Sequence, residues 1–360
     1  MPKEIFNPLR TVDSQTLMET LLPQPGFLIR GLLTEGVHIL CGALKTGKSW
    51  MALWFCDRIA QGQPVWNFPT QQCDVLYLCL EDSYVRLQNR LYDIAEEGAP
   101  NLRLALLAGT IRETLPRQIV EFADRYPATR FVVIDTLQKI RAITNDNAYA
   151  SDYSDISILK DLAAQKHLCI LLIHHLRKAH DDDPFNMISG TNGITGAVDS
   201  SMVLIPQRRG GGKAVLHCTG RDIETRELEL SFDAGTHRWQ LLHDSIEEPE
   251  RKLDPALVTM LEYVKQKGSF TGTATELLAA LAEQSGGVSA SSLSKKMRQN
   301  VSLLAELGLQ MQASRSGERR EWSLAYDGND GNDVCGGMPG APSAVSQPSQ
   351  AAAQPLRADV

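Results

Sequence analysis

The segment CGALKTGKSW, residues 41–50, holds two glycines, a lysine and a serine at the spacing G-x-x-x-x-G-K-[ST]. In such a loop main-chain N–H groups wrap a phosphate, the lysine reaches the β and γ phosphates, and the serine hydroxyl ligates Mg²⁺. The apolar run before the segment predicts a strand and the residues after it predict a helix, as this chemistry requires. A glycine-rich turn with an exposed lysine is the alternative. We expect these residues to form the phosphate site: Gly42, Ala43, Leu44, Lys45, Thr46, Gly47, Lys48 and Ser49.

Carboxylates at the ends of two other apolar runs could act on a nucleotide held there. Asp135 ends the run FVVID, where its carboxylate can hold the Mg²⁺ water shell. The next residue is Thr136, whereas many motor ATPases have there a glutamate that activates water, so the base must come from elsewhere. Glu81 ends VLYLCLE on the strand expected alongside and is the leading candidate, with Asp82 as the second. A helix N-cap or a solvated charge is the alternative for Glu81.

Two histidines, His174 and His175, end the run LCILLIHH. A polar side chain at the tip of a central strand can hydrogen-bond the γ-phosphate and report its loss to the segment that follows. A capped or core histidine is the alternative. The following segment, residues 177–201, is long, polar and glycine-containing, which predicts a mobile loop. Its three consecutive aspartates would repel a phosphate backbone.

The elements that would position these residues alternate along the chain. Six near-continuous apolar runs, from VHILCG to SSMVLIPQ, suit strands buried on both faces of a parallel sheet. Helices would cross between them at residues 50–61, 85–97, 115–125 and 155–166. After Pro206 closely spaced alternating segments appear, which we expect to finish the same sheet as antiparallel strands. The expected fold is an α/β sandwich over residues 25–245.

A second, smaller unit is expected at residues 250–326, after a charged break. Three helices, at residues 255–266, 273–284 and 291–307, precede two alternating strands, an order that predicts a winged helix. An interaction domain with an ordinary solvated face is the alternative. The third helix and the wing carry the basic residues expected to contact DNA: Lys295, Lys296, Arg298, Arg315, Arg319 and Arg320.

The two ends of the chain are expected to lie outside both units. Residues 1–24 would form an N-terminal extension. Residues 327–360 have few large apolar side chains, so we expect a disordered tail there.

Six segments together resemble the RecA-like P-loop ATPases of the plasmid RepA and DnaB-type helicase group, the RepA-like AAA family. They are GALKTGKS, LYLCLEDSYVRLQNRL, VVIDTL, LLIHHLRK, SGTNGITGAVDS and TGRDIE, and the resemblance covers about residues 25–240. It implies that Glu81 activates water and that Asp135 serves Mg²⁺. It further implies that His174 or His175 senses the γ-phosphate.

The resemblance also implies a ring, usually a hexamer, with the nucleotide between subunits and an arginine that reaches in from the neighbour. Such an arginine accelerates phosphoryl transfer by about 10³ to 10⁵-fold. The candidates are Arg208, Arg209 and Arg221. A solvated hairpin is the alternative for the first two, and a salt bridge at a turn or sheet edge is the alternative for Arg221. Ser201 and Met202 stand where helicases of the group often carry this arginine.

Composition limits the remaining possibilities. The chain has 360 residues and a formal net charge of −7, so nucleic-acid contacts must come from local patches. Its seven cysteines include no C-x-x-C pair, and no window approaches the ~18 apolar residues of a membrane span. We expect a cytoplasmic protein that uses ATP and Mg²⁺.

The expected function is Mg²⁺-dependent ATP hydrolysis by a hexameric ring that acts on single-stranded or duplex DNA. The protein would be a replicative helicase or a replication accessory of a plasmid, phage or integrated element. One alternative is a DNA-binding regulator switched by ATP without unwinding activity. Another is a RecA-like recombination or repair mediator that forms filaments. GTP in place of ATP stays open, because no motif for base specificity is legible.

Overall fold

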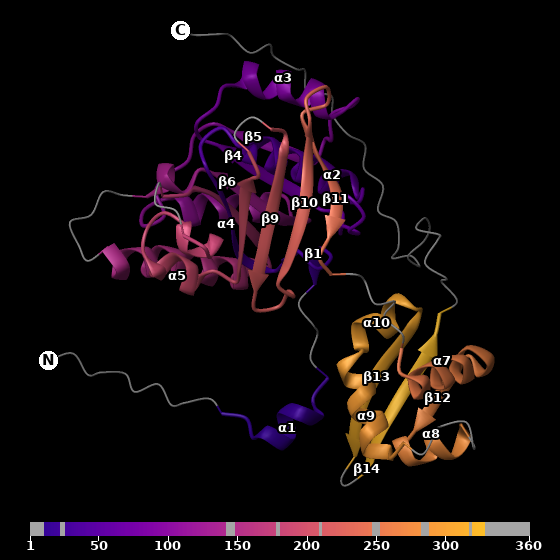
Figure 1. The fold of residues 1–360 in the computed structure, drawn as a ribbon. Helices are drawn as coiled ribbons and strands as arrows, with labels where there is room; N and C mark the ends of the chain where they lie inside the picture. The colour runs from indigo at the N-terminus through magenta and orange to yellow at the C-terminus, as the bar shows by residue number, and fades with distance from the viewer. Residues whose placement is uncertain are drawn as a thin grey trace, which may run out of the picture. The chain divides into compact units, whose positions relative to one another are not determined.

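The structure, a computed structural model, describes residues 11–21, 26–141, 148–177, 181–208, 211–246, 253–281, 288–316 and 319–327. The chain divides into two compact units, Pro25–Arg251 and a second unit that combines Met1–Gln24 with Lys252–Val360 (Figure 1). Each unit has a hydrophobic core of its own. The predicted tail lies outside the described residues from position 328 onward, and so does Arg209.

A sheet of nine strands forms the centre of the larger unit, in the order β11-β10-β9-β8-β3-β7-β6-β4-β5. Six neighbouring strands run parallel, as the apolar runs predict. They are β3 (Gly36–Gly42), β4 (Asp74–Cys79), β5 (Leu102–Ala105), β6 (Thr129–Asp135), β7 (Cys169–His175) and β8 (Ser200–Pro206). Their carboxyl ends meet at one edge of the sheet, where ligands bind in open α/β folds.

The last three strands of the unit pair antiparallel and continue the same sheet beyond β8, which confirms the prediction. They are β9 (Lys213–Gly220), β10 (Arg226–Asp233) and β11 (Arg238–Asp244). A separate two-stranded ribbon precedes the sheet and consists of β1 (Phe27–Ile29) and β2 (Leu33–Thr34).

Helices complete a core on each face of the sheet. Along β4, Tyr77 faces the core that contains α2 and α3, whereas its neighbour Leu76 faces the core that contains α4 and α5. This alternation is the two-residue period of a strand buried on both faces. The crossover helices are α2 (Lys48–Gln61), α3 (Tyr84–Ile94), α4 (Leu115–Arg125) and α5 (Ala148–Lys166). Shorter turns are η1 (Leu137–Ile140), η2 (Pro184–Met187) and α6 (Asn192–Ala197).

The smaller unit packs helices on a three-stranded sheet of order β12-β14-β13. Its core includes Met260, Met297 and Trp322, and Leu21 from the N-terminal segment packs against it. The N-terminal segment is therefore part of this unit. The elements are α1 (Ser14–Glu19), α7 (Pro255–Lys267), β12 (Ser269–Gly272), α8 (Ala274–Ala280), α9 (Ala290–Gln299), α10 (Val301–Glu306), β13 (Leu309–Ser316) and β14 (Arg319–Tyr326).

Two elements of the smaller unit differ from the prediction. The single helix expected at residues 291–307 is interrupted at Asn300, which caps both α9 and α10. The short strand β12 was not predicted, and it pairs with β14. Local signals do account for the start of α8, where Thr273 and Glu276 form a reciprocal capping box.

Candidate nucleotide site

The P-loop joins the end of β3 to the start of α2, and its two glycines leave no room for side chains. Gly47 has a φ of 84°, in the left-handed region, and a Cβ there would lie 2.9 Å from Trp239 Nε1. A Cβ at Gly42 would lie 2.9 Å from Thr46 Oγ1 and 3.2 Å from the Leu204 carbonyl oxygen. The glycines therefore permit the tight turn that a phosphate-binding loop requires.

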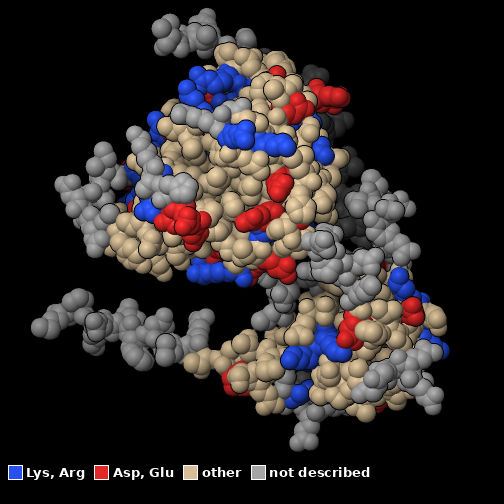
Figure 2. Space-filling model, viewed as in Figure 1, with Lys and Arg blue, Asp and Glu red and all other residues tan. Residues whose placement is uncertain are grey.

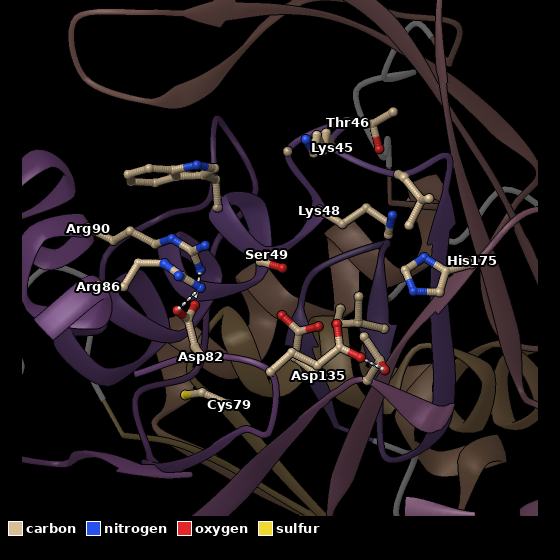
Figure 3. Close-up of a pocket in the computed structure, with 16 residues that line it drawn as sticks. Lys45, Thr46, Lys48, Ser49, Cys79, Asp82, Arg86, Arg90, Asp135 and His175 are labelled. Carbon is tan, nitrogen blue, oxygen red and sulfur yellow. Dashed lines mark hydrogen bonds and ion pairs between the residues drawn. The ribbon is translucent and has the colours of Figure 1, made fainter. Parts of the chain in front are cut away.

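The loop borders a cavity of about 570 Å³ at the carboxyl edge of the sheet (Figure 3). This volume lies within the range of about 300–1,000 Å³ typical of small-molecule sites. Residues 44–50 form one part of the wall. Glu81, Asp135 and His175 also line it, so the structure brings together the strand-end residues that the sequence singled out.

Lys48 lies at the first position of α2 and folds back on its own loop. Its ammonium donates hydrogen bonds of 2.8 Å to the carbonyl oxygens of Gly42 and Ala43. Burial lowers the pKa of Lys48, and the nearby Asp135 carboxylate partly opposes this shift. A phosphate in the cavity would give the buried ammonium an anionic partner in place of neutral carbonyls.

Asp135 ends β6 with its side chain buried among polar partners. The carboxylate accepts a hydrogen bond of 2.9 Å from the Tyr77 hydroxyl. Burial raises the pKa of Asp135, and the Ser49 and Tyr77 hydroxyls oppose the rise. A divalent cation would relieve the cost of burying this charge, so Ser49 and Asp135 fit a Mg²⁺ site.

Magnesium usually takes one or two carboxylates and completes its shell with waters and substrate phosphates. Among the residues that the structure describes, no group of three or more His, Cys, Asp and Glu side chains could hold a metal. A Mg²⁺ ion at Ser49 and Asp135 would accordingly need a nucleotide to complete its coordination.

Glu81 reaches the cavity from the strand next to β6. The parallel register of β4 and β6 sets Cys79 beside Asp135, and Glu81 follows two residues later. Its Oε1 accepts a hydrogen bond of 3.2 Å from the Thr136 hydroxyl. Thr136 stands where many motor ATPases have a catalytic glutamate. Its hydroxyl thus binds Glu81, the carboxylate that can act in place of that glutamate.

Asp82, the second candidate for the base, forms ion pairs with two arginines. Its carboxylate lies 3.1 Å from Arg86 Nη1 and 2.5 Å from Arg90 Nη1. The two guanidinium groups occupy this carboxylate, so it is less available to an attacking water. The geometry therefore favours Glu81 as the base.

The two histidines at the end of β7 face opposite sides of the sheet. His175 lines the cavity, and burial together with the Lys48 charge lowers its pKa. His174 points to the other side, where its Nε2 lies 2.9 Å from the Ser189 carbonyl oxygen. His175 is thus the histidine that can contact a bound nucleotide.

The candidate arginines for a neighbouring site lie at opposite edges of the sheet. Arg208 follows β8 and is exposed at the edge where Gly42 of β3 ends beside Leu204. Arg221 follows β9, which runs antiparallel to β8, and its Nη1 lies 3.8 Å from Asp199 Oδ1. Neither arginine lines the cavity of its own subunit.

Sequence reasoning missed four side chains at this site. Trp50, Arg86 and Arg90 line the cavity, and Tyr77 supports Asp135 from β4. The two arginines follow Asp82 by four and eight residues, a helical spacing that could have revealed them. The signal for Tyr77 was a hydroxyl in an otherwise apolar strand. We find no such signal for Trp50.

The three basic residues of α9 differ in their surroundings. Lys295 is exposed. Lys296 Nζ lies 2.6 Å from Asp254 Oδ2, and the Arg298 guanidinium lies 4.9 Å from the centre of the Trp322 ring. Two of the three charges predicted to contact DNA are therefore engaged within the unit.

On the hairpin, the register of β13 and β14 sets Arg315 opposite Arg320 and Ser316 opposite Arg319. The side chains of Arg315 and Arg319 lie outside the described part of the structure. On the face of the larger unit seen in Figure 2, basic and acidic side chains are interspersed, so this face presents no continuous basic surface.

The mainly parallel sheet with the P-loop at its carboxyl edge gives the larger unit a RecA-like P-loop fold. Residues 3–181 match the family model described as AAA domain. No curated protein matches the chain. Within the described residues no helix is long and apolar enough to cross a membrane.

The solved structures that are similar to the chain include the following two. One is a DnaB-like replicative helicase, described with its interactions with primase, at a TM-score of 0.51 and 14% identity over 64% of this chain and 66% of that one. The other is described as an ATPase domain, at a TM-score of 0.49 and 14% identity over 58% of this chain and 85% of that one. The chain thus spans slightly less than two thirds of the helicase.

Proposed function

We propose that the chain hydrolyses ATP with Mg²⁺ in the cytoplasm, as a ring-forming assembly that acts on DNA. It would serve as a replicative helicase or a replication accessory of a plasmid, phage or integrated element. The observation that carries the proposal is the convergence of Lys48, Asp135, Glu81 and His175 on one cavity beside the P-loop. Three separate strands and a helix end supply these side chains, as a triphosphate site requires.

Each residue has a role that follows from its position. The P-loop amides and Lys48 would bind the phosphates, and Ser49 and Asp135 would hold Mg²⁺. The cation would neutralise charge on the β and γ phosphates. Glu81, oriented by Thr136, would take a proton from the attacking water, and neutral His175 would hydrogen-bond the γ-phosphate.

Assembly into a ring would bring an arginine from a neighbouring subunit to this cavity. Arg208 is the better candidate, because it is exposed at the same sheet edge as the P-loop. Arg221 is already paired with Asp199 at the other edge. An arginine supplied in this way makes hydrolysis depend on assembly.

Contact with DNA is proposed for the smaller unit. Its order of helix, strand, three helices and hairpin supports a winged helix, whose third helix enters the major groove. Lys295 is exposed on that helix.

The test couples an ATPase assay to unwinding of a forked duplex. We expect single-stranded DNA to stimulate hydrolysis and the duplex to separate. Lys48→Ala should abolish tight ATP binding, and Glu81→Gln should bind ATP but stall turnover. Slow hydrolysis that DNA does not stimulate, with no strand separation, would instead indicate an ATP-switched regulator. Normal hydrolysis by Glu81→Gln would remove Glu81 from the mechanism.

A further inference from the structure

Two arginines of the same subunit line the nucleotide cavity. Arg86 and Arg90 extend from α3 towards the Asp82 carboxylate, across the cavity from Lys48 and His175 (Figure 3). The proposed function draws its arginine from a neighbouring subunit and gives these two no role. Their presence raises the question of what they do for a bound triphosphate.

Arg90 is mostly buried and makes two contacts. Its side chain is 18% exposed, and its Nη1 lies 2.5 Å from Asp82 Oδ2. The guanidinium also lies 5.3 Å from the centre of the Trp50 ring, within the range of a cation–π contact. Moving Arg90 would leave the Asp82 carboxylate, itself 10% exposed, with fewer charged partners.

Arg86 is held much less firmly. Its side chain is 62% exposed, and its contact with Asp82, four residues earlier, is 3.1 Å long. Because most of the Arg86 side chain lies in water, its release from Asp82 costs little. Because Arg90 keeps Asp82 paired, Arg86 can leave that carboxylate without stranding a buried charge.

We propose that Arg86 turns from Asp82 to the γ-phosphate of a nucleoside triphosphate bound in its own subunit, and acts there as a catalytic residue. The inference rests on the proposed ATPase function. Water attacks the γ-phosphorus, a new P–O bond forms, and the bond to the β–γ bridging oxygen breaks. The diphosphate leaves with the electron pair of that bond, and Glu81 takes the proton from water. Arg86 stays protonated throughout and neutralises charge on the γ-phosphate oxygens.

A surface ion pair without a catalytic role is the competing explanation, and the chain offers a matched control for it. Arg117 and Glu121 also form an arginine–carboxylate pair four residues apart, on α4, at 2.8 Å and with more exposed side chains, 83% and 62%. That pair does not line the nucleotide cavity. Arg117→Ala therefore removes an exposed arginine that pairs four residues away and leaves the site intact.

The first experiment compares Arg86→Ala, Arg86→Lys and Arg117→Ala in the full chain. We expect Arg86→Ala to lower kcat by about 100-fold, the loss typical of removing one charge-stabilising donor. The Kd of a non-hydrolysable ATP analogue should change by less than about threefold, because the proposed contact strengthens in the transition state. Arg86→Lys should recover part of the rate, and Arg117→Ala should match the wild type. A kcat of Arg86→Ala within twofold of Arg117→Ala would overturn the proposal.

The second experiment asks which subunit supplies the arginine. A mixture of Glu81→Gln subunits with Arg86→Ala subunits should regain no activity. Each side chain acts in the cavity of the subunit that carries it, so every cavity in the mixture lacks one of the two. Recovery would show that Arg86 acts on a neighbouring site and would overturn the proposal. A mixture of Glu81→Gln subunits with Arg208→Ala subunits tests the proposed ring separately, because Arg208 would act in the cavity of a neighbouring subunit. If the wild type hydrolyses no more ATP than Lys48→Ala does, the proposed function itself fails, whatever Arg86 contributes.

Discussion

Gly47 lies where the nucleotide loop touches the last strand of the larger unit. Its left-handed φ and the nearby Trp239 indole both exclude a side chain. We expect Gly47→Ala to lower the free energy of unfolding by about 1–3 kcal/mol, from backbone strain and crowding. Nucleotide affinity should fall with it. Urea unfolding and calorimetric titration with ATP would measure the two effects.

Gly98→Ala is the control for that substitution. A Cβ at Gly98 would meet nothing within 4 Å, and the residue's φ lies outside the left-handed region. Its free energy of unfolding should stay within about 0.5 kcal/mol of the wild type. Equal losses at both positions would show that the contact with Trp239 is unimportant.

Two buried histidines should make stability depend on pH. Burial lowers the pKa of His38 and of His174 below the ordinary value of 6.5. Near and below that value the unfolded chain binds protons that the folded chain excludes. Their contribution is therefore complete above pH 6.5 and is lost as the pH falls through the lower folded values.

Urea unfolding at several pH values between 7.5 and 5 would test this expectation. The free energy of unfolding should decline towards acid, and the decline should be smaller in His38→Gln. That variant can keep the bond that the His38 ring makes to the Thr34 carbonyl oxygen. An unchanged slope would remove His38 as a source of the effect.

Several residues of the site could be foreseen because motif spacing fixes their chemistry. Lys48 and Ser49 follow from the loop pattern, and Asp135 and Glu81 follow from the ends of apolar runs. The choice between His174 and His175 could not be made, because it depends on which face of β7 each residue occupies. Strand alternation is visible in sequence, but the side of the sheet that the P-loop uses is not.

At the scale of elements, a buried ionic cluster ties α5 to the segment that follows β7. Asp152 Oδ2 accepts hydrogen bonds from the Thr191 amide at 2.8 Å and from its hydroxyl at 2.9 Å, and Oδ1 binds Arg141. We expect Asp152→Ala to lower the free energy of unfolding by about 3 kcal/mol, since it leaves buried donors unpaired. Arg141 keeps its bond to Asp155, which limits the loss. Hydrogen exchange should also accelerate at Thr191.

Glu121→Ala is the comparison, because it breaks an exposed ion pair of the same charge type. Its effect should stay below about 0.5 kcal/mol. If Asp152→Ala costs no more than this, the cluster does not hold the segment in place.

The parallel strands could be predicted because each is buried on both faces and reads as a continuous apolar run. The strand β12 could not, because it has four residues and is defined by its pairing with β14 more than fifty residues later. The break at Asn300 was also missed. The apolar periodicity continues through it, and side chains of both α9 and α10 join the same core, so periodicity alone gives no sign of the break.

At the scale of the whole molecule, the separate cores of the two units predict two unfolding transitions. A fragment of residues 25–251 should retain ATP binding and show one transition. At 100 times the Kd, ATP should stabilise that unit by about 2.7 kcal/mol and leave the other transition in place. Differential scanning calorimetry of the full chain and the fragment would show this. A single transition, or a shift of both by ATP, would mean that the units fold together.

The N-terminal segment shows what sequence could not assign at this scale. Residues 1–24 read as an extension because they precede the first strand. Leu21 nevertheless packs against the core formed by residues near the other end of the chain. Nothing in a local pattern reports which distant core a single leucine will join.

The packing of Trp239 against Gly47 has a consequence for synthesis on the ribosome. The phosphate loop emerges early, whereas Trp239 emerges with the final strand of the unit. The main-chain carbonyl oxygen of Trp239 also accepts a hydrogen bond from Trp66 Nε1. A nascent chain that has not yet reached residue 239 therefore lacks one wall of the loop. Ribosome-bound chains should retain ATP only once that strand has left the exit tunnel, so the protein is kept from binding its nucleotide until the larger unit is finished.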